Sequence, residues 1–465
     1  MSTGRGVDSA DGRGLRSAVE GIVWPAILPD AGAHLLAVNF QLERSQWWSE
    51  AEMQGHQMTQ LRHLLAHAVK EVSYYGRPEY RSWLDTSENE ARQAFSELPL
   101  LTRRQAQEAG DSMFAEGLPG QHGGITEGQT SGSTGVPLRY RTTAVAAFFW
   151  NAIVLREHFW QGRDFSARHA FIRSRTPVDL SPTWGPPSNM IFACGESANL
   201  PANSSLEKRH EWLLEMDPHY LMTTPSILRS LAERAIEGVL PLQRLRETRT
   251  VGETVTASLR ELVRRAWGVE VTDSYSSSEC GLLALQCPES GRYHVQSEWA
   301  VVEVLDARGQ PCLPGEVGRV VVTPIHNFAM PLVRYDTGDY AEVGEPCVCG
   351  RGLPSLNRIL GRRRNRMFLP GGGVIWPNLS SFPWQDLAPR LRKFQVLQKK
   401  DCSLLLRYES ERDFLRDERD RLVRALLDYL RCTLPICFER VDGLPTSDAG
   451  KLEDFITEIV PEVDA

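Results

Sequence analysis

Thr130-Ser131-Gly132-Ser133-Thr134-Gly135 is a short segment in which four hydroxyl side chains surround two glycines. Glycine adopts positive φ without strain and lets the backbone approach a ligand closely. A run of backbone N–H groups can then hold the oxygens of a phosphate. The segment lacks the Gly-Lys-Ser/Thr ending of a Walker A motif, which disfavours an ordinary phosphoryl-transfer loop. Taken alone, it also fits a plain surface turn, because Gly/Ser/Thr clusters commonly mark turns.

The composition is that of a globular protein with two or three domains. The chain has 465 residues, of which 42% are hydrophobic and 24% charged, and domains typically run to about 100–200 residues. The net charge of −7 argues against nucleic acid as a main partner, since that usually needs a basic face. The nine cysteines are an odd number scattered along the chain, which disfavours a disulfide framework and favours a reducing cytoplasm.

The N-terminal region contains neither a signal peptide nor a membrane span by its sequence. Residues 1–20 are rich in Gly, Ser, Asp and Arg and have no apolar core, which predicts a disordered tail. Residues 21–40 are apolar but are interrupted by Pro25, Pro29 and Asp30, so they cannot form an unbroken membrane-spanning helix. We therefore expect no membrane partner.

Hydrophobic periodicity predicts alternating helices and strands in the first 270 residues. The helices are expected at 57–72, 142–160, 204–215, 225–237 and 256–267, and short strands at 170–172, 220–222 and 247–251. Alternation of this kind is typical of α/β layers with a largely parallel sheet. The predicted fold class is therefore α/β.

Further along the chain the pattern changes to strands and then to a separate tail. Segments 298–305 and 318–323 flank the turn Asp306-Ala307-Arg308-Gly309, which predicts a β-hairpin within a small β-subdomain at about 285–360. A polar, basic stretch at 361–366 marks the expected domain boundary. We predict a tail at 1–20, an N-terminal domain at 21–361 and a small α+β C-terminal domain at 362–465 that contains an amphipathic helix at 411–431.

Four further motifs follow the segment Thr130–Gly135, here called the glycine loop, along the chain. They are Val251-Gly252-Glu253, Asp273-Ser274-Tyr275-Ser276-Ser277-Ser278-Glu279, Arg334-Tyr335-Asp336-Thr337-Gly338-Asp339 and Pro445-Thr446-Ser447-Asp448-Ala449-Gly450-Lys451. Each alone is compatible with turn chemistry or a polar loop. Their order and spacing resemble the adenylate-forming superfamily (acyl-CoA synthetases, adenylation domains and luciferases). Within it the chain is similar to the phenylacetate–CoA ligase-like branch, which includes F390-synthetase-like and capsular-polysaccharide-type members.

The resemblance implies a set of ATP contacts. Thr130 and the segment Ser131, Gly132, Ser133, Thr134 and Gly135 would hold the β- and γ-phosphates. Gly252 and Glu253 would line the adenine side, and Tyr275 would stack on the adenine ring. Ser274, Ser276, Ser277, Ser278 and Arg362 would complete the nucleotide site. Asp339 would accept hydrogen bonds from both ribose hydroxyls.

Two residues would carry the chemistry. The resemblance implies that Glu279 holds Mg²⁺, which prefers carboxylate oxygen ligands and commonly bridges substrate phosphates. Lys451, on a loop of the mobile C-terminal domain, would stabilise the charge that develops when a carboxylate attacks the α-phosphorus. The expected reaction converts an aryl or other small hydrophobic acid and CoA to an acyl-CoA, AMP and pyrophosphate. The expected protein is a monomer or homodimer.

Departures from the family pattern keep other functions open. Val136 stands where many relatives carry a lysine, and Arg139 or Arg141 could supply the missing charge. The hinge reads Arg363-Arg364-Asn365-Arg366 where relatives usually have an acidic residue, which bears on the second half-reaction. The alternatives are an amide-forming ligase, a carrier-protein loading enzyme and an inactive nucleotide-binding relative.

Cys287, His294, Cys347 and Cys349 form a second candidate site. Three thiolates and one imidazole would make a closed tetrahedral zinc site of the structural kind. Ordinary buried cysteines are the alternative, because a C-x-C pair is less specific than C-x-x-C. Some members of the branch carry a similar cluster. Trp150, Trp184, Asn189 and Phe192 are candidates for the walls of the acyl pocket, although aromatic side chains are more often simply core.

Overall fold

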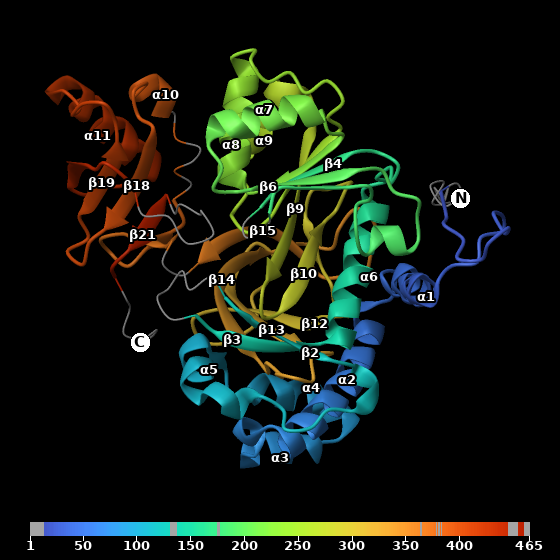
Figure 1. Cartoon of the computed structure of the whole chain (residues 1–465). Helices are drawn as coiled ribbons and strands as arrows, with labels where there is room; N and C mark the ends of the chain where they lie inside the picture. Colours follow the sequence, from blue (N-terminus) through green and yellow to red (C-terminus); the bar gives the residue numbers. More distant parts are fainter. Residues whose placement is uncertain are drawn as a thin grey trace.

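A computed structural model describes residues 14–130, 137–173, 177–362, 365–377, 379, 382, 384–444 and 454–459. Figure 1 shows N-terminal helices at one end of a long twisted sheet, further helices at the other end and a C-terminal group of elements to one side. Among the described residues, no helix combines the length and the apolar character needed to cross a membrane.

The N-terminal helices are α1 (Asp30–Ser45), α2 (Glu50–Glu71), α3 (Pro78–Leu84), α4 (Glu88–Glu97) and α5 (Arg103–Ala109). A capping box begins α2: the Ser49 side chain accepts from the Glu52 backbone, and the Glu52 carboxylate accepts from the Ser49 N–H at 2.8 Å. This box satisfies backbone donors that would otherwise lack partners. The helix predicted at 57–72 therefore begins seven residues earlier.

A hairpin presents the glycine loop. Strands β2 (Ile125–Gln129) and β3 (Arg139–Thr143) are antiparallel, with Gln129 opposite Arg139. Beyond the strands, Thr130 N donates to Leu138 O at 3.0 Å, and Leu138 N donates to Thr130 Oγ1 at 2.9 Å. Helix α6 (Ala144–Trp160) follows directly, capped by the Thr143 side chain. The hairpin thus brings Thr130 and Leu138 together, and the segment 131–136 between them lies outside the described residues.

The first half of the main sheet is largely parallel, which confirms the α/β prediction. Its strands are β4 (His169–Arg173), β5 (Asp179–Ser181), β6 (Ser197–Pro201), β7 (Tyr220–Thr223), β8 (Glu247–Thr250) and β9 (Glu270–Ser277). They run in the order β9-β8-β7-β4-β6-β5, and all neighbours are parallel except the edge strand β5. Helices α7 (Leu206–Met216), α8 (Pro225–Ile236) and α9 (Ala257–Trp267) contribute leucines to a core with this sheet.

The second half of the same sheet is antiparallel. It contains β10 (Gly281–Gln286), β11 (Tyr293–Val295), β12 (Ala300–Leu305), β13 (Val317–Pro324), β14 (Tyr335–Val343) and β15 (Ser355–Arg362), with β1 (Leu101–Thr102) added parallel to β14. The β9–β10 pair joins the two halves. The predicted β-subdomain at 285–360 is therefore hydrogen-bonded into the main sheet, and its side chains share a core with the N-terminal helices.

The C-terminal elements have a core of their own. They are β16 (Met367–Phe368), β17 (Val374–Ile375), α10 (Trp384–Leu387), β18 (Lys393–Gln398), β19 (Leu404–Glu409), α11 (Arg416–Leu430), β20 (Ile436–Arg440) and β21 (Phe455–Thr457). Four strands form a sheet in the order β20-β19-β18-β21. Leu422, Leu426 and Leu430 of α11 pack on it. Helix α11 begins at Arg416, five residues later than the amphipathic helix predicted at 411–431.

The disordered tail predicted at 1–20 needs a correction. Leu15 pairs with Phe192 in an isolated β-bridge, and Arg16 N donates to Ile191 O at 2.8 Å. Ala193 N donates to Gly14 O at 2.7 Å. Residues 14–16 are thus attached to the main domain, because the backbone at 191–193 offers them hydrogen-bond partners. Residues 1–13 lie outside the described part of the chain.

Candidate functional site

A cavity of about 2180 Å³ lies between the main domain and the C-terminal elements. Its wall contains every described residue that the sequence assigns to the nucleotide site or to Mg²⁺: Thr130, Gly252, Glu253, Ser274, Tyr275, Ser276, Ser277, Ser278, Glu279, Asp339 and Arg362. They come from the β2–β3 hairpin, the segment after β8, the end of β9 and strands β14 and β15. The C-terminal elements add Trp376, Phe394 and Asp454 to the same wall.

Glu279 is a buried carboxylate with one oxygen already in use. Its side chain is 7% exposed. Tyr335 OH donates to Oε1 at 3.1 Å, and Arg103 Nη1 lies 3.4 Å from the same oxygen. Both contacts use Oε1, and Glu279 is one of the residues that line the cavity. Hard carboxylate oxygens of this kind suit Mg²⁺.

Asp339 lies beside Tyr275 at the cavity wall. Tyr275 OH donates to Asp339 Oδ2 at 2.8 Å, and Arg362 Nε lies 4.0 Å from Oδ1. Burial raises the pKa of Asp339, and the Arg362 charge and the Tyr275 hydrogen bond offset part of that rise. An ionised Asp339 could accept hydrogen bonds from a diol, and those bonds would favour its charged form.

Glu253 has a structural contact as well as a place on the cavity wall. Its carboxylate accepts from the Ser226 backbone N–H at 2.9 Å and from Ser226 Oγ at 3.0 Å, at the start of α8. A carboxylate at a helix N-terminus is favoured by the helix dipole. Gly252, just before it, has φ +80°, a conformation that glycine adopts without strain.

Several predicted residues lie outside the described part of the chain. They are Ser131, Gly132, Ser133, Thr134, Gly135, Val136 and Lys451, together with Arg363 and Arg364 of the predicted hinge. Their predicted roles therefore remain sequence-based. Asn365, at the other end of the hinge, is described, and its Nδ2 donates to Phe455 O at 2.7 Å.

The aromatic residues predicted for the acyl pocket do not line this cavity. Trp184 packs against His158 and Tyr220, with ring centroids 5.5 Å away in each case. Phe192 stacks on Phe165 at 4.2 Å. Trp150 is 40% exposed on α6, and Asn189 lies in a single turn at Ser188–Met190. Packing against aromatic side chains of α6 and of the segment after it thus engages Trp184 and Phe192 outside the cavity, whereas the Trp150 ring is partly exposed.

The two arginines suggested as replacements for the missing lysine are also engaged elsewhere. Arg139 Nη1 pairs with Asp111 Oδ1 at 2.8 Å, and Arg141 Nη2 pairs with Glu127 Oε1 at 2.7 Å. Neither arginine is on the cavity wall. The outward-facing positions of the hairpin bring them to neighbouring carboxylates.

Two cavity residues were missed by the sequence reasoning. Arg103 contacts both Thr130 Oγ1 and Glu279. In the sequence, the capping box formed by Thr102 and Gln105 marks a helix start at Arg103 but gives no indication of a ligand site. Asp273 is buried and accepts hydrogen bonds from Tyr293 OH at 2.6 Å and Thr250 Oγ1 at 3.0 Å. Burial raises the pKa of Asp273 to about 6, against the lowering effect of these two bonds.

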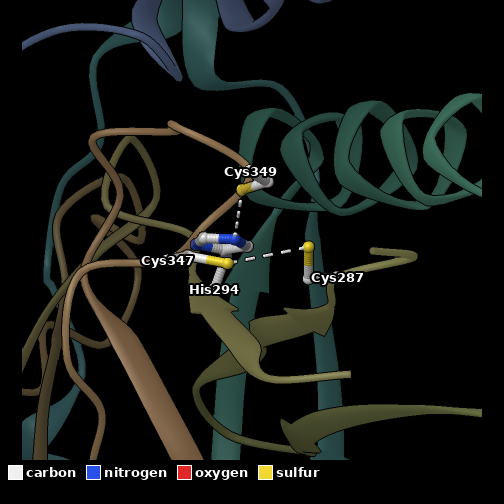
Figure 2. Close-up of side chains that lie close together, drawn as sticks. All are labelled: Cys287, His294, Cys347 and Cys349. Carbon is white, nitrogen blue, oxygen red and sulfur yellow. Dashed lines mark hydrogen bonds between the residues drawn. The ribbon is translucent and has the colours of Figure 1, made fainter. Parts of the chain in front are cut away.

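The predicted metal ligands meet in one place. Figure 2 shows the side chains of Cys287, His294, Cys347 and Cys349 directed toward one another, and their ligand atoms all lie within 4.8 Å of one another. The Cys347 and Cys287 sulfurs are 3.9 Å apart. Zn–S bonds of about 2.3 Å in a tetrahedron place two sulfurs about 3.8 Å apart.

The histidine of this cluster is oriented for metal binding. His294 is fully buried, and its Nδ1 lies 3.2 Å from Leu353 O. A hydrogen bond from Nδ1–H to a carbonyl fixes the tautomer that leaves Nε2 free to ligate. Nε2 lies 3.3 Å from Cys349 Sγ. The four residues therefore fit a closed tetrahedral zinc site in donor type and spacing.

Comparison with known proteins gives sequence relatives for part of the chain. The phenylacetate-coenzyme A ligase of Thermus thermophilus is 28% identical over 283 residues, which cover 54% of this chain and 63% of that protein. The enzyme of the same name from Escherichia coli is 26% identical over 176 residues, which cover 36% of this chain and 40% of that protein. The chain thus matches less than two thirds of the length of these relatives. No protein-family model matches the chain.

Solved structures share the fold over most of the chain. A 2-hydroxyisobutyryl-CoA ligase in a postadenylation state aligns with a TM-score of 0.69 over 90% of this chain and 92% of its own, at 18% identity. The anthranilate CoA ligase AuaEII in complex with anthranoyl-AMP aligns with a TM-score of 0.54 over 70% of this chain and 64% of its own, at 17% identity.

The likeness to these solved structures shows the fold of the chain, a large α/β domain followed by a small C-terminal sheet. In sequence, the chain is similar to phenylacetate-coenzyme A ligases over part of its length.

Proposed function

We propose that the protein is an ATP- and Mg²⁺-dependent ligase that activates a carboxylic acid as an acyl-adenylate and transfers the acyl group to CoA. AMP and pyrophosphate are the other products, and the acid is an aryl or other small hydrophobic one. The observation that carries this proposal is the convergence of residues separated by more than two hundred positions, from Thr130 to Arg362, on one cavity.

We propose a separate place in the cavity for each part of ATP. Thr130 leads into the glycine loop, which would hold the phosphates. Tyr275 would lie beside the adenine, and Asp339 would accept from the ribose hydroxyls. Glu279, on the cavity wall, would hold Mg²⁺ across the phosphates. Mg²⁺ would neutralise charge on the phosphates as the carboxylate approaches.

Lys451 would act in the first half-reaction from the C-terminal domain. Attack of a carboxylate on the α-phosphorus brings two anions together, so its barrier is largely electrostatic. An ammonium group between the acid oxygen and an α-phosphate oxygen lowers that barrier. We propose that the boundary lies at 361/362 and that the C-terminal domain turns about residues 362–366 between the two half-reactions, which makes turnover partly conformational.

We also propose that Cys287, His294, Cys347 and Cys349 bind a structural Zn²⁺. With four protein ligands, such a site has no open coordination position for chemistry. It would tie the turn after β10 to the loop between β14 and β15. The sequence-based placement of the protein in the reducing cytoplasm is compatible with thiolate ligands.

Pyrophosphate release measured over a panel of acids tests the proposed function. ATP and Mg²⁺ are present throughout, and hydroxylamine traps any activated acyl group as a hydroxamate. Acid-dependent pyrophosphate and hydroxamate are expected for at least one aryl or small hydrophobic acid. Parallel reactions with CoA or with amines identify the acceptor, and an acyl-amide product without a thioester would replace CoA transfer by amide formation. ATP binding without pyrophosphate release for any acid would contradict the proposal.

A further inference from the structure

Arg103 is held at the cavity wall by the local structure around it. Strand β1 pairs with β14, with Leu101 opposite Tyr335, and α5 begins immediately afterwards at Arg103. A capping box fixes this start: Gln105 Oε1 accepts from Thr102 N at 2.8 Å, and Thr102 Oγ1 accepts from Gln105 N at 3.2 Å. The first helical residue is therefore aimed toward Thr130 and Glu279.

The Arg103 guanidinium has donors to spare. Nη2 donates to Thr130 Oγ1, and Nη1 makes only a long contact of 3.4 Å to Glu279 Oε1. Nε is buried and has no hydrogen-bond partner among the described residues. The side chain is 20% exposed. A guanidinium carries five N–H donors in a fixed fork, and buried donors are normally satisfied, so this geometry suits an additional anion.

Three other arginines of the cavity wall are paired with carboxylates. Arg358 Nε donates to Glu342 at 2.8 Å, Arg407 Nε to Glu439 at 3.0 Å, and Arg392 Nη2 to Glu411 at 2.8 Å. The segment 130–136 itself contains no lysine or arginine. A triphosphate tail held by that segment would therefore need a cation from another element, and Arg103 contacts the residue at which the segment begins.

We propose that Arg103 binds the β- and γ-phosphates of ATP, and the pyrophosphate that leaves, by exchanging Glu279 for phosphate oxygens. In the free protein the guanidinium lies against Glu279. With Mg²⁺ and ATP bound, Glu279 would hold the metal and the guanidinium fork would take two phosphate oxygens, a geometry that arginine matches well. This inference rests on the proposed function, since it needs a nucleotide in the cavity.

Calorimetric titration with ATP, pyrophosphate and AMP, each with Mg²⁺, tests the proposal without requiring knowledge of the acid. Loss of charge-assisted hydrogen bonds in Arg103→Gln should weaken binding of ATP and of pyrophosphate by about 10- to 100-fold. Binding of AMP, which lacks both outer phosphates, should change by less than about twofold. Arg103→Lys should restore part of the affinity for ATP.

The neighbouring Arg104 provides a matched control, because its side chain is 76% exposed and lies 3.8 Å from Glu108. Arg104→Gln should bind all three ligands like wild type. Equal losses for AMP and ATP in Arg103→Gln would assign a purely structural role to Arg103 and overturn the inference, as would unchanged ATP binding. A wild-type protein that binds neither ATP nor AMP would instead overturn the proposed function itself.

Discussion

The zinc proposal predicts a large effect of Cys347→Ser on stability. Cys287 and Cys347 are 60 positions apart, and a cross-link that closes a loop of this length removes about 4 kcal/mol of chain entropy from the unfolded state. Serine is a poor zinc ligand, so the substitution should release the metal and lose most of that stabilisation. For a domain of this size, the loss corresponds to a fall in Tm of roughly 8 °C.

The assay combines metal analysis with calorimetry. Wild-type protein should contain one zinc per chain, whereas Cys347→Ser should contain little or none, and a chelator should lower the Tm of wild type toward that of the variant. Cys437→Ser is the matched control, because Cys437 is exposed and outside the cluster. Wild-type protein without zinc would refute the reasoning, and so would equal Tm values for the two variants.

Three further substitutions have defined outcomes. Lys451→Ala should lower acid-dependent pyrophosphate release by about 100-fold or more, the size of a single electrostatic contribution. Glu157 is fully buried and accepts from Arg163 Nη2 at 3.2 Å and from Arg249; Glu157→Gln leaves both cations short of a partner and should lower the free energy of unfolding by about 3–5 kcal/mol, measured by denaturant titration. Burial raises the pKa of Asp273 to about 6. The folded state therefore binds more protons than the unfolded state between about pH 4 and pH 6, and the free energy of unfolding should fall by about 3 kcal/mol as the pH rises through that window. The substitution Asp273→Asn should remove this dependence on pH.

Each of these outcomes has a control. The far-ultraviolet circular dichroism of Lys451→Ala should match wild type, and unchanged pyrophosphate release would remove Lys451 from the mechanism. Glu261→Gln changes an exposed carboxylate that pairs with Arg264 at 2.9 Å, and exposed pairs contribute about 0–1 kcal/mol. If Glu157→Gln lowered the free energy of unfolding by no more than Glu261→Gln does, Glu157 would not stabilise the protein through a buried ion-pair network with Arg163 and Arg249. A pH slope for Asp273→Asn equal to that of wild type would exclude Asp273 as its source.

Much of the local structure could be predicted because its signals are local. The helix at α6 follows from a long apolar run, and α8 and α9 follow from hydrophobic residues repeated at helical spacing. Their strands and helices alternate as expected for a parallel sheet. Helix starts were less accurate: the predicted start of α2 missed the capping box at Ser49 and Glu52.

The chain order of the motifs also indicated which residues meet around the cavity. The family resemblance implied that Gly252, Tyr275 and Asp339 meet; in the structure they come from the segment after β8, from β9 and from the middle of β14. The four metal ligands were identified by residue type, because three thiols and an imidazole are a chemically specific set. Distances and burial could not be obtained in this way.

The sequence by itself thus determined the α/β class, the order of elements and the residue types available for ATP and metal binding. The tertiary structure alone decided which side chains remain free for a ligand. It directs Glu253 to the start of α8, buries Trp184 away from the cavity and brings Arg103 to Glu279 across 176 positions. Periodicity and capping act over a few residues, whereas partners for buried charges and space for aromatic rings depend on packing between elements distant along the chain.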